Sequence, residues 1–188
     1  MKIFTYIKDN SFRVERKNFR HIGNKEMWKH LIHELADFDV YIDTDSSEVI
    51  QECNTDELLG RVTAYPREDK FIDIENDPNN KISPANLMVD SFLDNYVTDD
   101  DEVVVVTHVT SPFLRKETIM DAVSYLDKGY EFVHSVYERQ DFAWMGDDYV
   151  PINFDPSVVQ RTQDVPKLYF SNGAFFIFRK KDFKKYNN

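Results

Sequence analysis

Short apolar segments alternate along this chain with longer amphipathic ones. The segment Glu102–Val106 holds four consecutive valines, which is typical of a central parallel strand covered on both faces. Other short, β-prone segments lie at 2–7, 38–42, 61–65, 131–136 and 174–178. Helical patterns fall between them, at 25–35, 46–52, 84–96 and 116–126. The alternation predicts a three-layer α/β/α domain, Rossmann-like, with a mainly parallel sheet.

Three stretches modify this pattern. The segment 68–81 carries five acidic residues and an Asp-Pro-Asn-Asn run, which predicts a loop. Asp45, with Glu48 three residues later, has capping-box spacing and is expected to begin the helix that runs to Glu52. Residues 137–160 break the rhythm and carry Phe142, Trp144 and Tyr149. We expect a single domain, 1–188, from which 137–160 project as a small β-rich arm.

Composition narrows the classes of partner. The net charge of −11 and a pI near 4.9 argue against nucleic acid and against an anionic membrane surface. The sequence has no apolar run as long as a spanning helix and no signal-peptide pattern at its start, so we expect no membrane partner. A lone Cys53 fits a reducing compartment, and the expected location is cytoplasmic.

A cluster of cations follows the first strand directly, on a chain that is otherwise acidic. Its members are Lys8, Arg13, Arg16, Lys17 and Arg20. Ligands of open α/β sheets bind at the carboxyl ends of the strands, and a cationic loop there suits a polyphosphate. Taken alone, such a loop is also typical of a solvated turn.

Polar motifs also follow the next three strands, at 43–45, 65–67 and 107–112. Because parallel strands end at one edge of the sheet, these motifs are expected to face one pocket with the cationic loop. The acidic run Asp99–Glu102 instead precedes the central strand, which places it at the opposite edge and predicts a solvated turn.

Five motifs appear in a known order along the whole chain. They read Lys8-Asp-Asn-Ser11-Phe-Arg13-Val-Glu15-Arg-Lys17-Asn18, Asp43-Thr-Asp45-Ser46, Arg67 with Ser83, Thr110-Ser111-Pro112, and Arg161-Thr-Gln163-Asp-Val-Pro166-Lys-Leu-Tyr169-Phe-Ser-Asn172-Gly173-Ala174. In this order they resemble the acylneuraminate cytidylyltransferase family, which makes CMP-activated nonulosonic acids. Each motif alone is common, and the resemblance depends on their combination.

The resemblance implies a cytidylyltransferase that transfers CMP from CTP to an acidic sugar, such as a sialic acid, with release of pyrophosphate. A Kdo-like ulosonic acid is a possible acceptor in the same class. The resemblance also implies Mg²⁺ as cofactor and a homodimer formed through the arm, whose aromatic residues would equally suit a local cap on the core. Two alternatives remain open: a non-catalytic nucleotide- or sugar-binding homologue, and a nucleotidyltransferase for another sugar.

The family's residue roles carry over position by position. Lys17 and Arg13 would be the catalytic cations that neutralise the triphosphate. The nucleotide would be bound by Lys8, Ser11, Asn18, Arg67 and Ser83, with Arg67 toward the cytosine. The acceptor sugar would contact His108, Thr110, Ser111, Arg161, Gln163, Tyr169 and Asn172. Without the resemblance, His108 reads as a structural histidine and Asn172-Gly173 as a turn.

Three positions depart from the family pattern. Lys8 stands where the family has Arg, Glu15 where it has Pro, and His108 where it usually has Gln. A lysine offers phosphate a point charge in place of a bidentate fork. The family's Mg²⁺-binding Asp-x-Asp follows its last strand, and none follows 174–178 in this sequence, so the metal ligands are left unassigned and this chain is expected to bind CTP but to turn over slowly or not at all.

Overall fold

The computed structural model describes residues 1–11, 13–80 and 83–186. Its backbone contacts divide the chain into two compact units. The first consists of Met1–His134 and Ala174–Asn188, and the second of Ser135–Gly173. The second unit is wider than the arm expected at 137–160.

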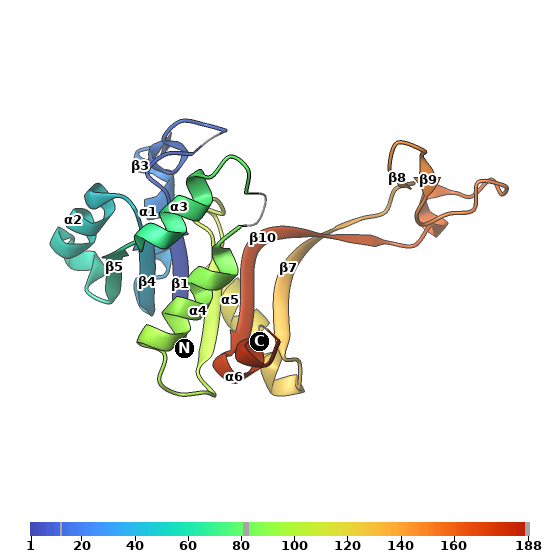
Figure 1. Ribbon diagram of the computed structural model, residues 1–188. Helices are drawn as coiled ribbons and strands as arrows, with labels where there is room; N and C mark the ends of the chain where they lie inside the picture. The colour runs from blue at the N-terminus through green and yellow to red at the C-terminus, as the bar shows by residue number, and fades with distance from the viewer. Residues whose placement is uncertain (12, 81–82, 187–188) are drawn as a thin grey trace. The chain divides into compact units, whose positions relative to one another are not determined.

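A six-stranded sheet runs through the first unit in the order β5-β4-β1-β6-β10-β7 (Figure 1). The strands are β1 (Lys2–Ile7), β4 (Asp39–Thr44), β5 (Val62–Pro66), β6 (Val103–Thr107), β7 (Phe132–Arg139) and β10 (Leu168–Arg179). β1 pairs in parallel with β4 and β6, and β4 with β5, whereas β10 runs antiparallel to β6. The last residues of β7 and the first of β10 belong to the second unit.

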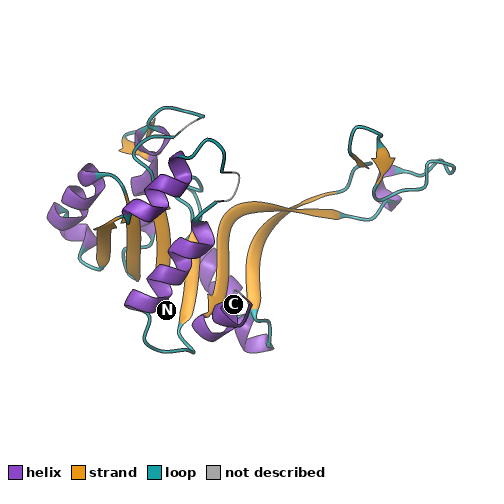
Figure 2. Ribbon diagram, in the orientation of Figure 1, coloured by secondary structure: helices purple, strands orange, loops and turns teal. Residues whose placement is uncertain are grey.

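Helices cover both faces of this sheet (Figure 2). Along β1, Ile3 faces one hydrophobic core and Phe4 faces the other, because successive strand residues point to opposite faces. The first core includes residues of α1 (Met27–Glu34), α2 (Ser47–Thr55) and α5 (Lys116–Val123). The second includes residues of α3 (Asp69–Asn76), α4 (Ala85–Tyr96) and α6 (Lys180–Tyr186). The predicted three-layer α/β/α fold with a mostly parallel sheet is confirmed.

The stretch expected as a loop at 68–81 contains helix α3, so that prediction was wrong. Phe71 is buried in the second core, and Ile74, three residues later, lies on the same side of a helix. The backbone amide of Asp77 bonds to the Asp73 carbonyl, and Pro78 then prevents further helix. The burial of Phe71 stabilises a helix in a segment whose acidic composition suggested a loop.

Smaller differences occur at other element ends. Lys25–Glu26 form strand β3, which pairs with β2 (His21–Ile22), so the first helix begins at Met27. The helix expected at 116–126 ends at Val123, and a 3-10 turn follows at Leu126–Lys128.

The second unit consists of the outer parts of β7 and β10 and a hairpin of β8 (Trp144–Met145) and β9 (Val150–Pro151). Asn153 is buried, accepts a hydrogen bond from the Ala143 amide and donates to the carbonyls of Asp141 and Pro166. Phe142 and Trp144 pack edge-on against Phe154. The unit therefore has a small core of its own.

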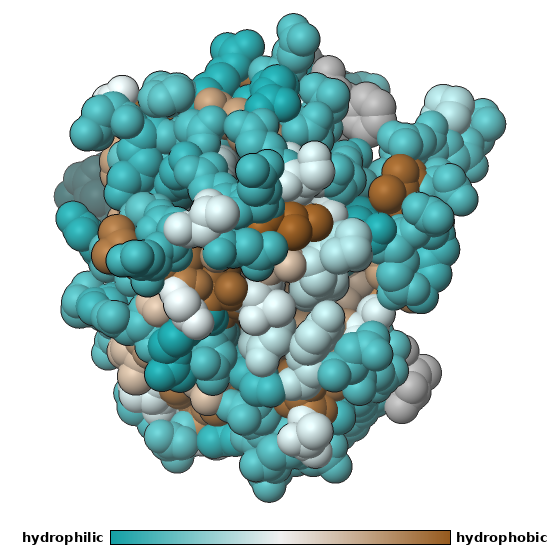
Figure 3. All heavy atoms as spheres, turned by 90° about the vertical axis from the view of Figure 1, so that its left-hand side faces the viewer, coloured by the Kyte–Doolittle hydropathy of each residue, from teal (hydrophilic) through white to brown (hydrophobic). Residues whose placement is uncertain are grey.

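Hydrophilic side chains dominate the face in Figure 3, as expected for a chain with 30% charged residues. Among the described residues, no helix has both the length and the apolar character needed to span a bilayer.

Candidate functional site

The strand pairings bring the predicted polar motifs to one edge. β1, β4, β5 and β6 all run in the same direction, so the segments that follow them leave the sheet at their shared carboxyl end. These segments are the cationic loop 8–20, the turn after Thr44, Arg67 and the turn after Thr107. The prediction that these segments share an edge is confirmed.

Two buried residues, Asn18 and Phe19, hold the cationic loop in its conformation. Asn18 is buried, and its Nδ2 donates to the Lys8 carbonyl at 2.9 Å, which closes the loop on itself. Phe19 is buried in the first core, and the Arg16 guanidinium lies 4.1 Å from its ring centroid. Arg16 adopts a left-handed backbone, with φ of 46°, to enter the 3-10 turn Lys17–Phe19. The loop's shape thus depends on its own side chains.

The loop's cations divide into paired and unpaired groups. Arg16 bridges Asp9 at 3.0 Å and Glu48 at 2.6 Å, and Lys8 pairs with Glu75 at 3.1 Å. Within the described residues, Arg13, Lys17 and Arg20 form no ion pair, although Arg20 donates a hydrogen bond to the Glu15 carbonyl at 3.2 Å. Arg13 is exposed and Lys17 half-buried, so both carry positive charge that is available to an anion.

Asp45 does not cap α2 as expected. Its Oδ1 accepts the backbone amide of Asp9 at 2.7 Å, and the residue before the helix is Ser46, whose side chain makes no capping bond. The carboxylate is used to hold the cationic loop to the end of β4. Capping-box spacing was therefore a misleading signal here.

Arg67 is placed at the centre of a buried ion network. Its side chain is fully buried, with Nε 2.6 Å from Asp43 Oδ1 and Nη1 2.9 Å from Glu75 Oε2. Its Nη2 also donates to the carbonyls of Ile7 and Asp43. Burial raises the pKa of Asp43, and the Arg67 guanidinium opposes this shift. These contacts make Arg67 a structural link between β1, β4 and α3, and its contact with a cytosine stays a prediction.

His108 lies at the end of β6, where the Tyr6 ring meets it edge-on at a centroid distance of 5.0 Å. Burial, and next the positive charge of Lys17, lower the pKa of His108. The imidazole is consequently neutral at neutral pH. The charge of Lys17 thus acts on His108, although the two are far apart in the sequence.

The turn after β6 is tightly bonded. The Ser111 amide donates to the His108 carbonyl at 2.9 Å, which leaves Thr110 exposed and Ser111 half-buried. On the other side of the sheet edge, exposed Ser83 precedes α4, and its Oγ accepts the Ala85 amide at 3.2 Å. Ser11 is half-buried within the loop. Ligand contact by these residues stays a prediction.

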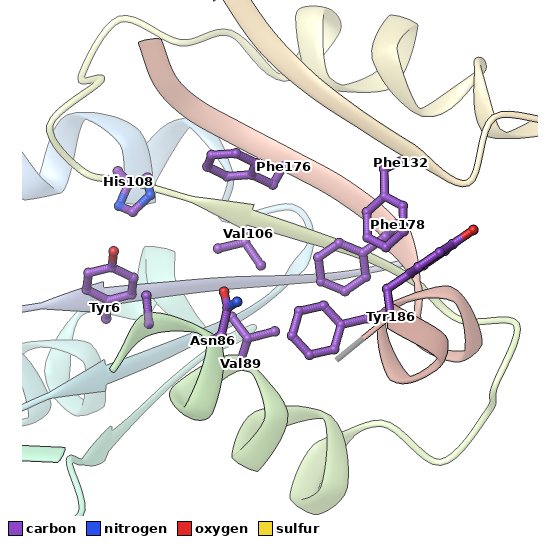
Figure 4. A pocket seen from close by; sticks show the side chains of 11 residues that line it. Tyr6, Asn86, Val89, Val106, His108, Phe132, Phe176, Phe178 and Tyr186 are labelled. Carbon is purple, nitrogen blue, oxygen red and sulfur yellow. The ribbon is translucent and has the colours of Figure 1, made fainter. Parts of the chain in front are cut away.

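Beside His108 the second face of the sheet contains a recess of about 500 Å³ (Figure 4). Strands β1, β6, β7 and β10 and helices α4 and α6 contribute to it. We call it the aromatic recess, because its walls include Tyr6, Asn86, His108, Phe176, Phe178 and Phe183. Of these residues only His108 was predicted from the sequence, because the pattern of strands and helices does not show which of their faces stay uncovered.

The remaining predicted sugar-binding residues lie in the second unit. Arg161 is exposed and pairs with Asp164 at 2.6 Å, while Gln163 offers its carbonyl to the side chain of Gln140. Tyr169 is exposed on β10, and Asn172 Oδ1 accepts a hydrogen bond from Ser135. Their predicted contact with the acceptor sugar is not tested by these positions.

The carboxylates do not form a protein-only metal site. Among the described residues, no group of three or more His, Cys, Asp or Glu side chains could hold a metal ion. At the strand-end edge, Asp9 forms an ion pair with Arg16, and Asp45 accepts a hydrogen bond from the backbone amide of Asp9. Asp100 and Asp101, in the acidic run before β6, pair with Lys180 and Lys181. The described residues therefore do not fit a metal that is held by protein ligands alone.

Neither a known family profile nor a curated protein sequence matches this chain. Solved structures do match it. One is CMP:2-keto-3-deoxy-manno-octonic acid synthetase complexed with CTP, with a TM-score of 0.65 and 13% identity over 98% of this chain and 76% of that one. Another is 4-diphosphocytidyl-2C-methyl-D-erythritol synthase from Anaerococcus prevotii DSM 20548, with a TM-score of 0.62 and 13% identity over the same shares of the two chains. This chain therefore shares its fold with these two synthases.

Proposed function

We propose that this protein is a cytidylyltransferase that transfers CMP from CTP to an acidic sugar and releases pyrophosphate. The observation that carries the proposal is that Arg13 and Lys17, in the loop at the strand-end edge, form no ion pair with a described residue and so offer their charge to an anion. A structural neighbour with the same fold is a CMP-sugar acid synthetase complexed with CTP. The motif order along the chain supports the same reaction.

The chemistry asks the protein mainly to position two substrates and to stabilise charge. The acceptor's hydroxyl oxygen bonds to the α-phosphorus of CTP as the bond from that phosphorus to the bridging oxygen breaks. Pyrophosphate leaves with the electron pair, and the hydroxyl proton passes to solvent. Lys17 and Arg13 would stabilise the negative charge that grows on the leaving pyrophosphate.

The acceptor would be a sialic acid or a related ulosonic acid. Neutral His108 can both donate and accept a hydrogen bond to sugar hydroxyls, and Thr110 and Ser111 lie in the same turn. Because the described carboxylates do not enclose a metal, we propose that Mg²⁺ would enter bound to the triphosphate, whose oxygens and retained waters would supply most of its ligands.

Two measurements test this function. In a thermal-shift assay with Mg²⁺, CTP is expected to raise the melting temperature more than ATP, GTP or UTP at equal concentration. Equal stabilisation by all four would contradict the choice of base. Pyrophosphate release is then measured with CTP and a panel of acidic sugars, and selective CTP binding without release for any sugar would favour the non-catalytic binding homologue.

A further inference from the structure

The aromatic recess continues from His108 along the sheet, away from the strand-end edge. β10 is antiparallel to β6, with Phe176 opposite Val106 and Phe178 opposite Val104. From His108 to the level of Phe178 is four residues of strand, or about 13 Å at the rise of a β-strand. The recess is therefore elongated along the strands.

Polar groups gather at one end of the recess. The Tyr6 hydroxyl and the His108 ring line it there, and the Asn86 amide lies between them and the aromatic rings, as Figure 4 shows. None of the three makes a hydrogen bond to another described residue, so all are available to a ligand. Lys17 adds positive charge near His108. This end suits an anionic, hydrogen-bonding group.

The opposite end is apolar. Phe178 and Phe183 have ring centroids 4.9 Å apart, and Phe132 lies 5.8 Å from Phe178 (Figure 4). The only hydroxyl there belongs, within the described residues that line the recess, to Tyr186, and it is already bonded to Glu131 at 2.6 Å. A sugar hydroxyl placed among these rings would lose water without gaining a partner, which is unfavourable.

We propose that the recess binds an apolar substituent of the acceptor, so that the preferred substrate is an acidic sugar bearing an acyl or aryl group considerably larger than acetyl. This inference rests on the proposed function, because it takes the acceptor to be an acidic sugar. The acidic, reacting end lies toward Lys17 and His108, and the substituent extends toward Phe178 and Phe183. Ring contacts and excluded water then favour the longer substituent.

The recess is tested first by direct binding of 8-anilinonaphthalene-1-sulfonate, which joins an aromatic body to an anion. Saturable binding at one site is expected. Ala85→Phe should weaken it by about tenfold or more, because Ala85 lines the recess at the start of α4. Leu87→Phe is the matched control, since Leu87 is exposed on the same helix outside the recess, and its binding should equal wild type. Both variants must keep wild-type melting temperatures.

Calorimetry in the presence of CTP tests the substituent. N-hexanoylneuraminic acid is expected to bind about tenfold more tightly than N-acetylneuraminic acid, because its extra methylenes become buried. Ala85→Phe should abolish that preference, and Leu87→Phe should keep it. If Ala85→Phe fails to fold, Tyr186→Ala serves instead, because it removes one ring from the apolar wall and should lower the preference.

The outcomes separate this inference from the proposed function. If the dye does not bind saturably, or if Ala85→Phe binds it as tightly as wild type does, the recess is not a binding site. Dye binding together with equal or absent binding of the two sugars would overturn the assignment of the substituent. CTP-dependent stabilisation reports on the proposed function alone, so it can persist when the recess fails and can be absent when the recess succeeds.

Discussion

At the residue scale, the site depends on which charges are already neutralised within the protein. Lys8, Arg16 and Arg67 have carboxylate partners, whereas Arg13 and Lys17 have none among the described residues. A cation with a partner must give it up to bind phosphate, so the unpaired pair is the stronger anion site. Sequence alone lists the five loop cations without distinguishing these two.

Removing Lys17 should weaken CTP binding without unfolding the protein. A hydrogen bond to a charged group contributes roughly 1.5–3 kcal/mol, so Lys17→Ala is expected to lower CTP affinity by about tenfold or more in calorimetry. Lys128→Ala removes the same charge from an exposed position in the turn after α5 and should leave affinity unchanged. Unaltered CTP affinity in a folded Lys17→Ala protein would exclude Lys17 from the phosphate site.

The pKa of His108 should respond to Lys17. Burial and the Lys17 charge both lower it, so NMR titration is expected to give a value below the usual 6.5 that rises in Lys17→Ala. His33 provides the control, because its pKa is lowered by burial and Lys25, not by Lys17. A His108 pKa that does not move in the variant would mean that the two side chains are not close.

The same shift gives the pH dependence of stability a sign. A histidine whose folded pKa is depressed stays neutral in the native state while the unfolded state takes up a proton. Its contribution is therefore present above the unfolded pKa of about 6.5 and is lost as the pH falls toward the folded value. Urea denaturation should show a lower free energy of unfolding at acidic pH. His108→Gln should reduce this pH dependence, and the part that remains should come from His33 and other groups.

At the element scale, helix α3 connects the second core to the buried ion network. Phe71 packs into the core from this helix, and Glu75 of the same helix reaches both Arg67 and Lys8. A single element thus positions an anion that holds the base of the cationic loop. The packing of α3 should therefore depend on Phe71 and on Arg67.

Phe71→Ala should destabilise the protein by about 3–5 kcal/mol, because it leaves a cavity in the second core. Asp73→Ala, exposed on the same helix, should change stability by less than about 0.5 kcal/mol. The free energy of unfolding from urea titration measures both. Similar effects from the two variants would show that α3 does not pack as described.

Arg67→Met should cost about 3–5 kcal/mol of unfolding free energy, because Asp43 would remain buried without its cation, whereas Glu75 would keep Lys8. Arg61→Ala breaks the exposed pair with Asp39 and should cost less than about 1 kcal/mol. If Arg67→Met leaves the free energy of unfolding nearly unchanged, the buried contacts of Arg67 do not hold α3 to the strand ends.

At the scale of the whole molecule, the second unit is distinguished by exposed aromatic and aliphatic side chains. Trp144, Met145, Tyr149 and Val159 are all more than half exposed within this chain. Large apolar side chains in such number on a small unit are typical of an interaction surface. These exposed side chains agree with the prediction, made from the sequence, that this segment forms a homodimer interface.

Sedimentation should therefore show a dimer at micromolar concentration. Trp144→Ala is expected to raise the dimer dissociation constant by about tenfold or more, as interface aromatic residues commonly do. Tyr130→Ala, which removes an exposed aromatic ring from the first unit, should have little effect. A wild-type monomer, or a Trp144→Ala protein that dimerises as tightly as wild type, would contradict the assignment.

The sequence by itself determined the layers and the edge at which the site lies. Periodicity located β1, β4, β5 and β6 because each strand's residues alternate or run apolar over a few positions, a local property. Parallel order then required the segments after Ile7, Thr44, Pro66 and Thr107 to meet, whatever the side chains do. The tertiary structure alone decided which side chains neutralise one another, as in Arg67 with Asp43, 24 positions apart. It also decided that Phe71 draws an acidic stretch into a helix and that the aromatic recess remains uncovered, because burial and pairing depend on neighbours distant in sequence.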